Sequence, residues 1–291
     1  MTEVLVSSEE VPRLGFVRKL RVVSSPLIAG AFVVVVGVLV MGIFGDLLAP
    51  HNPGAQDLAL PLSHPSSAHW LGTDALGRDV LSRIVSGTRF AMLGPLVIAG
   101  GSVLVGNVLG LLAGYRGGLV DAVIMRWVDL MWSLPGLLVI IVVAASLHGG
   151  YWTAVLLLLA LSAPFDTRMV RAATLEQMAR PYVEAAKSLG LSTPRVMFLH
   201  VWPNVSPIAA ANAFLDFAAA LVALSTLAFL GFGIQPGTPD WGLMVAEGQN
   251  LLFTNPVGVL APCAMIVLAA ASLNLIGDWL YERLVSRGAT R

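Results

Sequence analysis

Long apolar stretches that lack Asp, Glu, Lys and Arg recur along this chain. A helix needs about 20 mostly apolar residues to cross the roughly 30 Å hydrocarbon core of a bilayer. Residues 26–45 and 90–115 each meet this length as one helix. Residues 130–165 are too long for one helix and are interrupted by His148-Gly149-Gly150. They therefore predict a hairpin of two helices.

The C-terminal half adds two further apolar segments. Residues 196–239 contain a single charge, Asp216, but Pro203, Pro207 and a Gly-Phe-Gly turn at 231–233 limit the expected helix to about 207–230. Residues 248–277 supply the last span. We predict an all-α polytopic membrane protein with spans at about 26–48, 90–114, 123–147, 151–166, 207–230 and 257–279.

The basic residues are distributed unevenly between the two predicted faces. Fourteen of the 17 lie on or beside the N-terminal segment 1–25, the loop between spans two and three, the loop 167–205 and the tail 282–291. The positive-inside rule makes this face cytoplasmic, and an even number of spans also places both termini together. The first apolar stretch exceeds the length of a signal-peptide core, so we expect an uncleaved anchor.

Composition supports a membrane protein. Hydrophobic residues make up 57% of the chain and charged residues 12%, about half the charged share of a soluble domain. These values argue against a soluble enzyme, a nucleic-acid binder and a disordered chain. The net charge of zero indicates no partner. Cys263 has no second cysteine to pair with, and we expect it to be a packing residue.

The predicted external loop 49–89 is rich in turn-forming residues. Asp79 is expected to cap a short amphipathic helix that begins at Val80. A glycine-rich phosphate loop requires Gly-Lys-Ser/Thr, and the only lysines, Lys19 and Lys187, lack that context. We therefore expect no ATP hydrolysis by this route.

Three histidines of the same loop lie near acidic residues in the sequence. These are His51, His64 and His69, with Asp57, Asp74 and Asp79. Their spacing matches no established ligand pattern, so the sequence predicts no metal site.

The cytoplasmic segment 167–205 contains the clearest candidate for a docking element. Asp166 or Thr167 is expected to cap a helical stretch that runs to Ala179. Pro181 then favours the first turn of a second helix, which contains Glu184, Ala185 and Ala186 and ends at Gly190 in a left-handed conformation. The small side chains of Ala185 and Ala186 allow another backbone or side chain to approach closely. From physical reasoning alone, docking and an ordinary amphipathic connector are equally good interpretations.

These residues resemble a known family. Glu184-Ala185-Ala186, then Gly190 and Pro203, are similar to the Glu-Ala-Ala loop of bacterial ATP-binding-cassette (ABC) importer permeases, with His200 and Trp202 where the general pattern has isoleucine and leucine. Further matches to the C-type permeases of oligopeptide and dipeptide importers are Gly72, Thr73, Asp74, Gly77, Arg78, Asp79, Gly231, Trp241, Gly242, Asn274, Gly277 and Asp278. The resemblance covers about residues 26–287. Many relatives have glutamate at the position of Leu224.

The resemblance implies a type I ABC importer permease fold in a bacterial inner membrane. The chain would form half of the translocation pathway for peptides, beside a second homologous permease. Two ABC ATPase subunits, or one fused chain, would dock on the Glu-Ala-Ala loops and carry ATP and Mg²⁺. An extracytoplasmic binding protein would deliver the substrate. This chain itself would bind no cofactor, would not contact nucleic acid and would not be an enzyme. Nickel chelates are an alternative cargo.

An ionisable residue inside a span indicates function by default. Asp216 and Asn212, one turn apart on the same helix face, are our candidates for the pathway lining. The alternative is that Asp216 pairs with a neighbouring helix and only fixes packing. A self-sufficient secondary transporter is a weaker alternative because no internal repeat is evident. A membrane anchor or signalling protein would leave the external signature unexplained.

Overall fold

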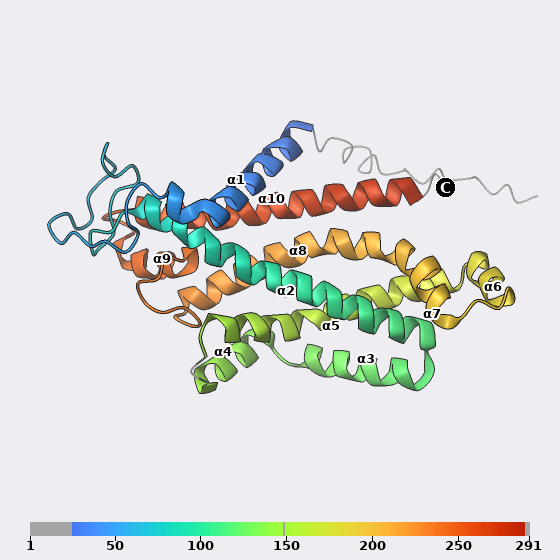
Figure 1. Cartoon of the computed structure of the whole chain (residues 1–291). Coiled ribbons are helices and arrows are strands. Elements are labelled where there is room, and N and C mark those ends of the chain that lie inside the picture. Colours follow the sequence, from blue (N-terminus) through green and yellow to red (C-terminus); the bar gives the residue numbers. More distant parts are fainter. Residues whose placement is uncertain (1–24, 148, 289–291) are drawn as a thin grey trace, which may run out of the picture.

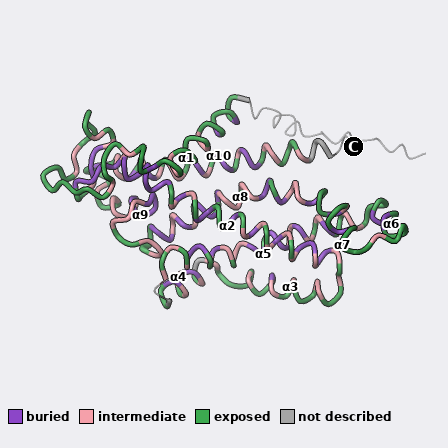
Figure 2. Tube along the Cα trace, viewed as in Figure 1, coloured by how far each residue is buried: buried purple, intermediate pink, exposed green. Residues whose placement is uncertain are grey.

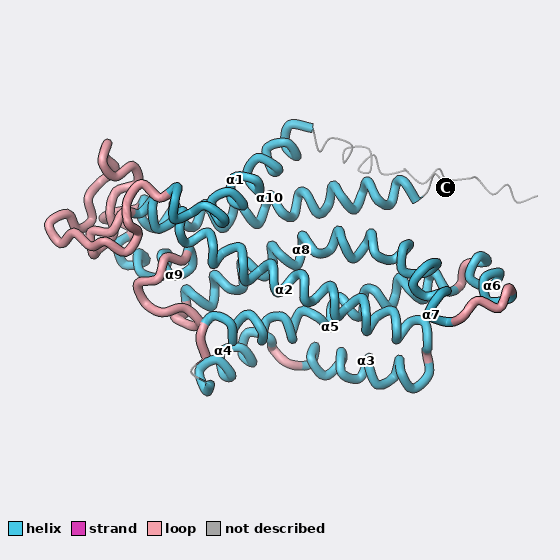
Figure 3. The backbone as a smooth tube through the Cα atoms, viewed as in Figure 1, coloured by secondary structure: helices cyan, strands magenta, loops and turns pink. Residues whose placement is uncertain are grey.

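The computed structural model describes residues 25–147 and 149–288 and is almost entirely helical (Figures 1 and 3). Residues 1–24 of the predicted N-terminal segment, His148 and the last three residues of the predicted tail lie outside this description. The α-helices are α1 (Ser25–Leu48), α2 (Val80–Arg116), α3 (Gly118–Ser133), α4 (Gly136–Leu147), α5 (Tyr151–Met178), α6 (Pro181–Ser188), α7 (Thr193–Val196), α8 (Trp202–Phe229), α9 (Trp241–Gly248) and α10 (Val257–Gly288).

The helices account for the predicted membrane spans. Within the described residues, five helical segments are long and apolar enough to cross a bilayer: α1, α2, α5, α10 and the segment Thr193–Phe229. The pair α3 and α4 gives a sixth candidate, which is bent by 86°. The predicted all-α polytopic class is confirmed, and six spans result if the bent pair counts as one.

The helices form an elongated bundle with two distinct ends (Figure 1). At one end, α9 lies beside the loop of residues 49–79, and we call this the loop end. At the other, α6 and α7 lie near the turn between α2 and α3, and we call this the α6 end. Buried residues concentrate along α2, α5 and α8 in the middle of the bundle (Figure 2).

Helix α2 corrects the predicted boundary at residue 90. The expected short helix after Asp79 is the beginning of α2, which continues without a break to Arg116. Asp79 does cap it, since its side chain accepts a hydrogen bond from the Ser82 amide at 2.8 Å. Arg83 falls in the predicted external loop 49–89, outside the charge-free stretch that begins at residue 90. It is buried and ion-paired in the second turn of α2, so its charge does not end the helix.

The third predicted span is not straight. Leu134 is extended, with φ −95° and ψ 134°, and separates α3 from α4. The cause is Pro135, because the residue before a proline avoids the helical region. The structure therefore breaks the predicted span 123–147 near its middle.

The boundaries around the predicted cytoplasmic segment 167–205 also differ. Asp166 and Thr167 are buried inside α5, not caps, and the Thr167 hydroxyl donates to the Ala163 carbonyl at 2.8 Å. Helix α8 begins at Trp202 and contains Pro203 and Pro207. A π-helical turn over Met197–Val201 precedes it. Such a turn is one way for a helix to accommodate the missing N–H group of a proline. Helix α8 therefore begins before residue 207, the start that the prolines predicted.

Close packing of α2 against α5 depends on glycines at four-residue spacing. A Cβ on Gly110 would lie 2.8 Å from the Thr167 carbonyl oxygen, and one on Gly114 would lie 3.0 Å from that of Arg171. Small residues at this spacing let helix backbones approach closely in membranes. Asp166 of α5 lies at this contact, beside Gly106, and is buried in the interior of the bundle.

Candidate functional site

Helix α6 has one face anchored in the protein and another exposed. Val183 is fully buried and Ala186 is nearly so, and both pack in a cluster with Leu111 of α2 and Val170 of α5. Glu184 and Ala185 are exposed. The small Ala186 side chain thus allows close approach by the chain's own core. The exposed surface is formed by Glu184 and Ala185 on a firmly seated helix.

The ends of α6 follow the sequence signals. Pro181 occupies the first turn. Gly190 has φ +75°, and its amide donates to the Lys187 carbonyl at 2.9 Å while the Leu191 amide donates to that of Ala186 at 3.3 Å. This pair of bonds is a Schellman motif. The predicted left-handed conformation of Gly190 is confirmed.

Further contacts fix α6 against the bundle. The Lys187 ammonium lies 5.7 Å from the centre of the Tyr115 ring at the end of α2. The Tyr182 hydroxyl donates to Gln177 Oε1 at 2.9 Å and accepts from Asn204 Nδ2 at 3.3 Å. Partial burial raises the pKa of Tyr182, against the effect of the Asn204 bond. Pro203, the last predicted residue of the loop, is exposed in the first turn of α8 beside this network.

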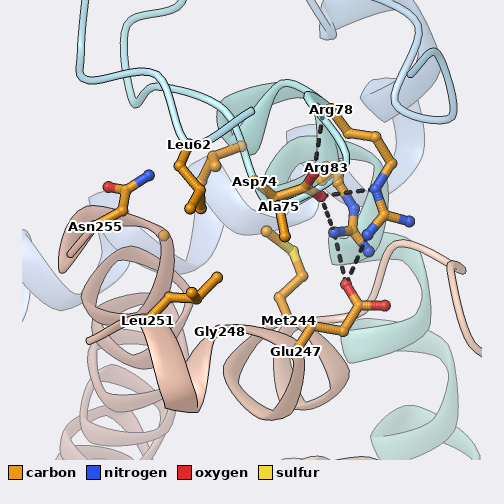
Figure 4. A pocket seen from close by; sticks show the side chains of 12 residues that line it. Leu62, Asp74, Ala75, Arg78, Arg83, Met244, Glu247, Gly248, Leu251 and Asn255 are labelled. Carbon is orange, nitrogen blue, oxygen red and sulfur yellow. Dashed lines mark hydrogen bonds and ion pairs between the residues drawn. The ribbon is translucent and has the colours of Figure 1, made fainter. Parts of the chain in front are cut away.

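Four charged residues converge at the loop end (Figure 4). Asp74 Oδ2 accepts from Arg78 Nε at 2.7 Å and Arg83 Nη1 at 2.6 Å. Glu247 Oε2 of α9 accepts from Arg78 Nη2 at 2.9 Å and Arg83 Nη1 at 2.8 Å. Both arginines are at least 95% buried. Two cations thus face two anions in a balanced cluster that joins the loop, α2 and α9, and we call it the loop-end cluster.

The other signature residues before α2 shape the loop that carries this cluster. Thr73 Oγ1 donates to the Leu60 carbonyl at 2.6 Å. Gly72 and Gly77 have φ values of +74° and +71°, and a Cβ on either would collide with the backbone of Ser63 or Asp57. Only glycine suits such positions. These residues therefore have a structural role, which holds Asp74 and Arg78 in place.

Asp79 is part of a separate group at the same end. Its Oδ2 accepts from the amide and hydroxyl of Ser82, and its Oδ1 lies 2.9 Å from His69 Nδ1. Burial alone would raise the pKa of Asp79, but the hydrogen bonds from Ser82 and His69 outweigh it, and the pKa lies below its usual value. The ring centres of His51 and His69 are 4.8 Å apart, and the ring planes are tilted by 36°.

The signature at Trp241-Gly242 seats α9 on the bundle. Trp241 is fully buried, and its indole N–H donates to the Ile84 carbonyl at 3.0 Å. Gly242 packs against the backbone of Ser225 in α8, without room for a Cβ. Asp240 caps α9 through the Leu243 amide at 2.9 Å, and its burial raises its pKa to about 6.

A second polar cluster lies inside the bundle. Asn212 Nδ2 donates to Asp166 Oδ1 at 2.9 Å and to Asp216 Oδ2 at 3.0 Å. Ser102 of α2 donates to Asp166 as well. Asp166 is 1% exposed and Asn212 is 8% exposed. We call Ser102, Asp166, Asn212 and Asp216 the membrane cluster. Asn212 and Asp216 share a face as predicted, but the pairing with Asp166 was not expected.

The remaining signature residues lie in the turn after α8 and in α10. Gly231 has φ +83° directly after α8. In α10, Gly277 packs closely against Phe214 and the Ala211 carbonyl of α8. Asn274 and Asp278 are exposed on the same helix. Asn212 and Asp278 line one cavity of about 210 Å³ between α8 and α10.

Sequence reasoning missed Glu247 and misjudged Asp166. Glu247 is one of only three acids between residues 217 and 281, which is a signal that could have marked it as the partner of the arginines. Asp166 follows an apolar run, so it resembled a helix cap at the membrane boundary. Leu224, where relatives often have glutamate, is buried in an apolar cluster with Ile98 and Val155.

Comparison with known proteins agrees with this architecture. Residues 106–288 match the family described as "Binding-protein-dependent transport system inner membrane component". The chain is 38% identical to the "Probable D,D-dipeptide transport system permease protein DdpC" of Escherichia coli K12, over 89% of this chain and 87% of that one. It is 36% identical to the "Di/tripeptide transport system permease protein DppC" of Pseudomonas aeruginosa UCBPP-PA14, over 83% and 82%.

A solved structure shares the fold at low sequence identity. The inward-facing MetNI methionine ABC transporter has a chain that matches with a TM-score of 0.55 and 17% identity, over 69% of this chain and 96% of that one. This likeness confirms the type I importer permease fold. The chain therefore belongs to the family of binding-protein-dependent transport system inner membrane components, the multi-pass, non-catalytic permease subunits of ABC importers.

Proposed function

We propose that this chain is the permease subunit of an ATP-driven peptide importer and forms half of its translocation pathway. The observation that carries the proposal is its similarity, over more than four-fifths of both chains, to permeases named for dipeptide and di/tripeptide transport. A second, related permease forms the other half. A binding protein delivers the peptide at the loop end, and both termini lie on the cytoplasmic side with α6.

Coupling to ATP hydrolysis takes place at α6. Glu184 and Ala185 form the exposed surface on which an ATPase subunit docks, while Val183 and Ala186 anchor the helix to α2 and α5. Because α6 is packed into the same core as these spans, movement of a docked ATPase is transmitted as rigid-body movement of the helices. The chain itself binds no nucleotide, and two ATPase subunits, or one fused chain, supply ATP and Mg²⁺.

Asn212 and Asp216 are the proposed contact with the substrate. Asn212 lines the cavity between α8 and α10, and Asp216 accepts a hydrogen bond from it. A carboxylate at this position can attract the amino end of a peptide. Asp166 holds Asn212 in place through its hydrogen bond.

Co-purification tests the docking step. The full chain, expressed with the permease, ATPase and binding-protein genes that neighbour it, should bring down a second permease and the ATPase subunits. Ala185→Trp places a bulky side chain on the exposed face of α6, and we expect ATPase recovery to fall at least about tenfold, which corresponds to about 1.4 kcal/mol of binding free energy.

A matched variant controls for the added tryptophan. Leu119→Trp adds the same side chain at an 85% exposed position of α3 near the same end and should leave recovery unchanged. Equal recovery with Ala185→Trp and Leu119→Trp would contradict docking on α6. A stable, transport-active single chain would contradict the importer proposal itself.

A further inference from the structure

Two histidines and an aspartate that are distant in sequence meet at the loop end. One candidate ligand atom from each of His51, His69 and Asp79 lies within 4.8 Å of the other two. His69 Nδ1 is 2.9 Å from Asp79 Oδ1, and His51 Nδ1 is 3.8 Å from Asp79 Oδ2. Two ligands bound to one zinc ion, each at about 2.1 Å, can be at most about 4.2 Å apart. Both separations are within this limit. All three candidate atoms lie within 4.8 Å of one another, so a shift of about 0.6 Å at most brings every pair inside it.

Hydrogen bonds hold the backbones of both histidines and the Asp79 carboxylate in place. The His69 carbonyl accepts hydrogen bonds from the amides of Ser66 and Gly72 at 2.8 and 2.9 Å. The His51 amide donates to Ser82 Oγ at 2.9 Å, and that hydroxyl donates to Asp79 at 2.6 Å. Ser82 thus positions both a histidine and the carboxylate. Such outer contacts orient metal ligands and raise their affinity.

The Asp79 carboxylate can ligate without losing its role as a helix cap. Oδ2 receives both hydrogen bonds from Ser82, while Oδ1 faces His69. A metal ion held by Oδ1 and His69 would replace only the bond between these two groups. Asp79 and His69 side chains are 3% and 19% exposed, whereas that of His51 is 44% exposed. The exposed His51 ring can adjust, and the site opens to solvent on that side.

We propose that His51, His69 and Asp79 form a divalent transition-metal site with a preference for zinc. Two imidazole nitrogens and one carboxylate oxygen are ligands that zinc takes readily, and three protein ligands leave a fourth position for water. Hard cations such as Mg²⁺ and Ca²⁺ prefer oxygen ligands only. The site is distinct from the loop-end cluster of Asp74, Arg78, Arg83 and Glu247.

The expected effect of the metal is to fasten the loop of residues 49–79. His51 follows the end of α1, His69 lies in the turn before α2, and Asp79 is at the first residue before α2. One ion would join these three segments, so that the loop would open locally less often. Metal binding at this site would be independent of the substrate and of the ATPase partners.

Zinc binding to the purified full chain tests the site. The protein is prepared in detergent with a histidine-free affinity tag, stripped with a chelator and titrated with Zn²⁺ by calorimetry, with bound metal counted by mass spectrometry. We expect one equivalent per chain in the wild type. His51→Ala and His69→Ala should lose that equivalent or bind at least about tenfold more weakly. Titration with Co²⁺ should give the visible absorption bands of a four-coordinate site, absent in both variants.

The same loop offers a matched control. His64 is exposed and lies outside the cluster, so His64→Ala should bind zinc as the wild type does. His51→Ala changes a largely exposed ring, and an unchanged elution volume and helical circular dichroism would show that it folds. Zinc should also slow proteolysis within residues 49–79 in the wild type and in His64→Ala only. Wild-type protein without a stoichiometric zinc site, or equal affinity in all four proteins, would overturn the proposal.

Discussion

The two buried polar clusters differ in how their charges are balanced. In the loop-end cluster, Arg78 and Arg83 share Asp74 and Glu247, so each charge has an opposite partner. In the membrane cluster, Asp166 and Asp216 share only the amide of Asn212, and Ser102 adds a further donor. Two carboxylates so close in a low-dielectric interior cannot both be charged at low cost.

This difference in charge balance indicates a structural role for the loop-end cluster and a functional role for the membrane cluster. The loop-end cluster joins α9 to the start of α2 and depends on all its members. Loss of one member leaves an opposite charge buried without a counter-ion. The membrane cluster has no such mutual requirement. Ionisable groups inside a membrane span are costly to bury. Where no opposite charge neutralises them, a functional role is the first hypothesis.

The largest expected effect comes from removing one arginine of the loop-end cluster. Arg83→Ala leaves Asp74 and Glu247 with Arg78 alone, and we expect a loss of about 3–5 kcal/mol of stability. Thermal unfolding in detergent measures it. Arg89→Ala, two turns later in α2 at an exposed position, is the matched control and should change little. Similar unfolding temperatures for the two variants would show that the cluster is not a structural lock.

A second prediction concerns Asp240, an acid at the loop end whose carboxylate is held by backbone N–H groups. Its pKa is raised from 3.8 to about 6 by burial. Its stabilising contribution is therefore complete below about pH 4 and is lost as pH rises through 6, by up to about 3 kcal/mol. Asp240→Asn keeps the acceptor for the Leu243 amide and should remove this part of the pH dependence. Parallel melting curves of the two proteins between pH 4 and 7 would refute this origin.

A third prediction tests the membrane cluster for function. Asp216→Asn retains a polar group of the same size, so assembly should be unchanged. Uptake of a dipeptide with a free amino end should fall about tenfold, equivalent to about 1.4 kcal/mol. An N-acetylated dipeptide, if transported, should show a smaller difference between the two proteins. Unchanged uptake together with unchanged assembly would eliminate the pathway role of Asp216.

The smallest effect is expected for Asp166, the buried acid next to Asp216. Asp166→Asn removes one of two acids that are close in space and leaves no cation without a counter-ion. The free energy of unfolding should therefore change by less than about 1 kcal/mol or increase. Thermal unfolding beside Arg83→Ala measures the contrast directly. A loss as large as that of Arg83→Ala would mean that the two clusters have the same structural role.

Sequence patterns predicted the helices well where the relevant interaction is local. Apolar runs located the spans, Asp79 and Pro181 marked helix starts, and the left-handed Gly190 marked a helix end. These features depend on a few neighbouring residues, so they can be predicted without tertiary structure.

The failures concern residues whose environment is set by distant segments. The charge of Arg83 predicts a position outside the span, but its partner Glu247 lies 164 residues away in the sequence. Asp166 was expected to be a cap, whereas it bonds Asn212 across 46 residues. His51, His69 and Asp79 match no ligand spacing and are brought together only by the fold of the loop. No local pattern carries this information.

Under our proposal, this chain forms half of the membrane pathway of an ATP-driven peptide importer. The most direct test of this proposal is uptake of a labelled dipeptide into proteoliposomes that contain the chain with its partner permease and ATPases. We expect uptake only when ATP, Mg²⁺ and the binding protein are all supplied. Ala185→Trp should abolish this uptake, and Leu119→Trp should not. Uptake by this chain alone, driven by an ion gradient without ATP, would contradict it.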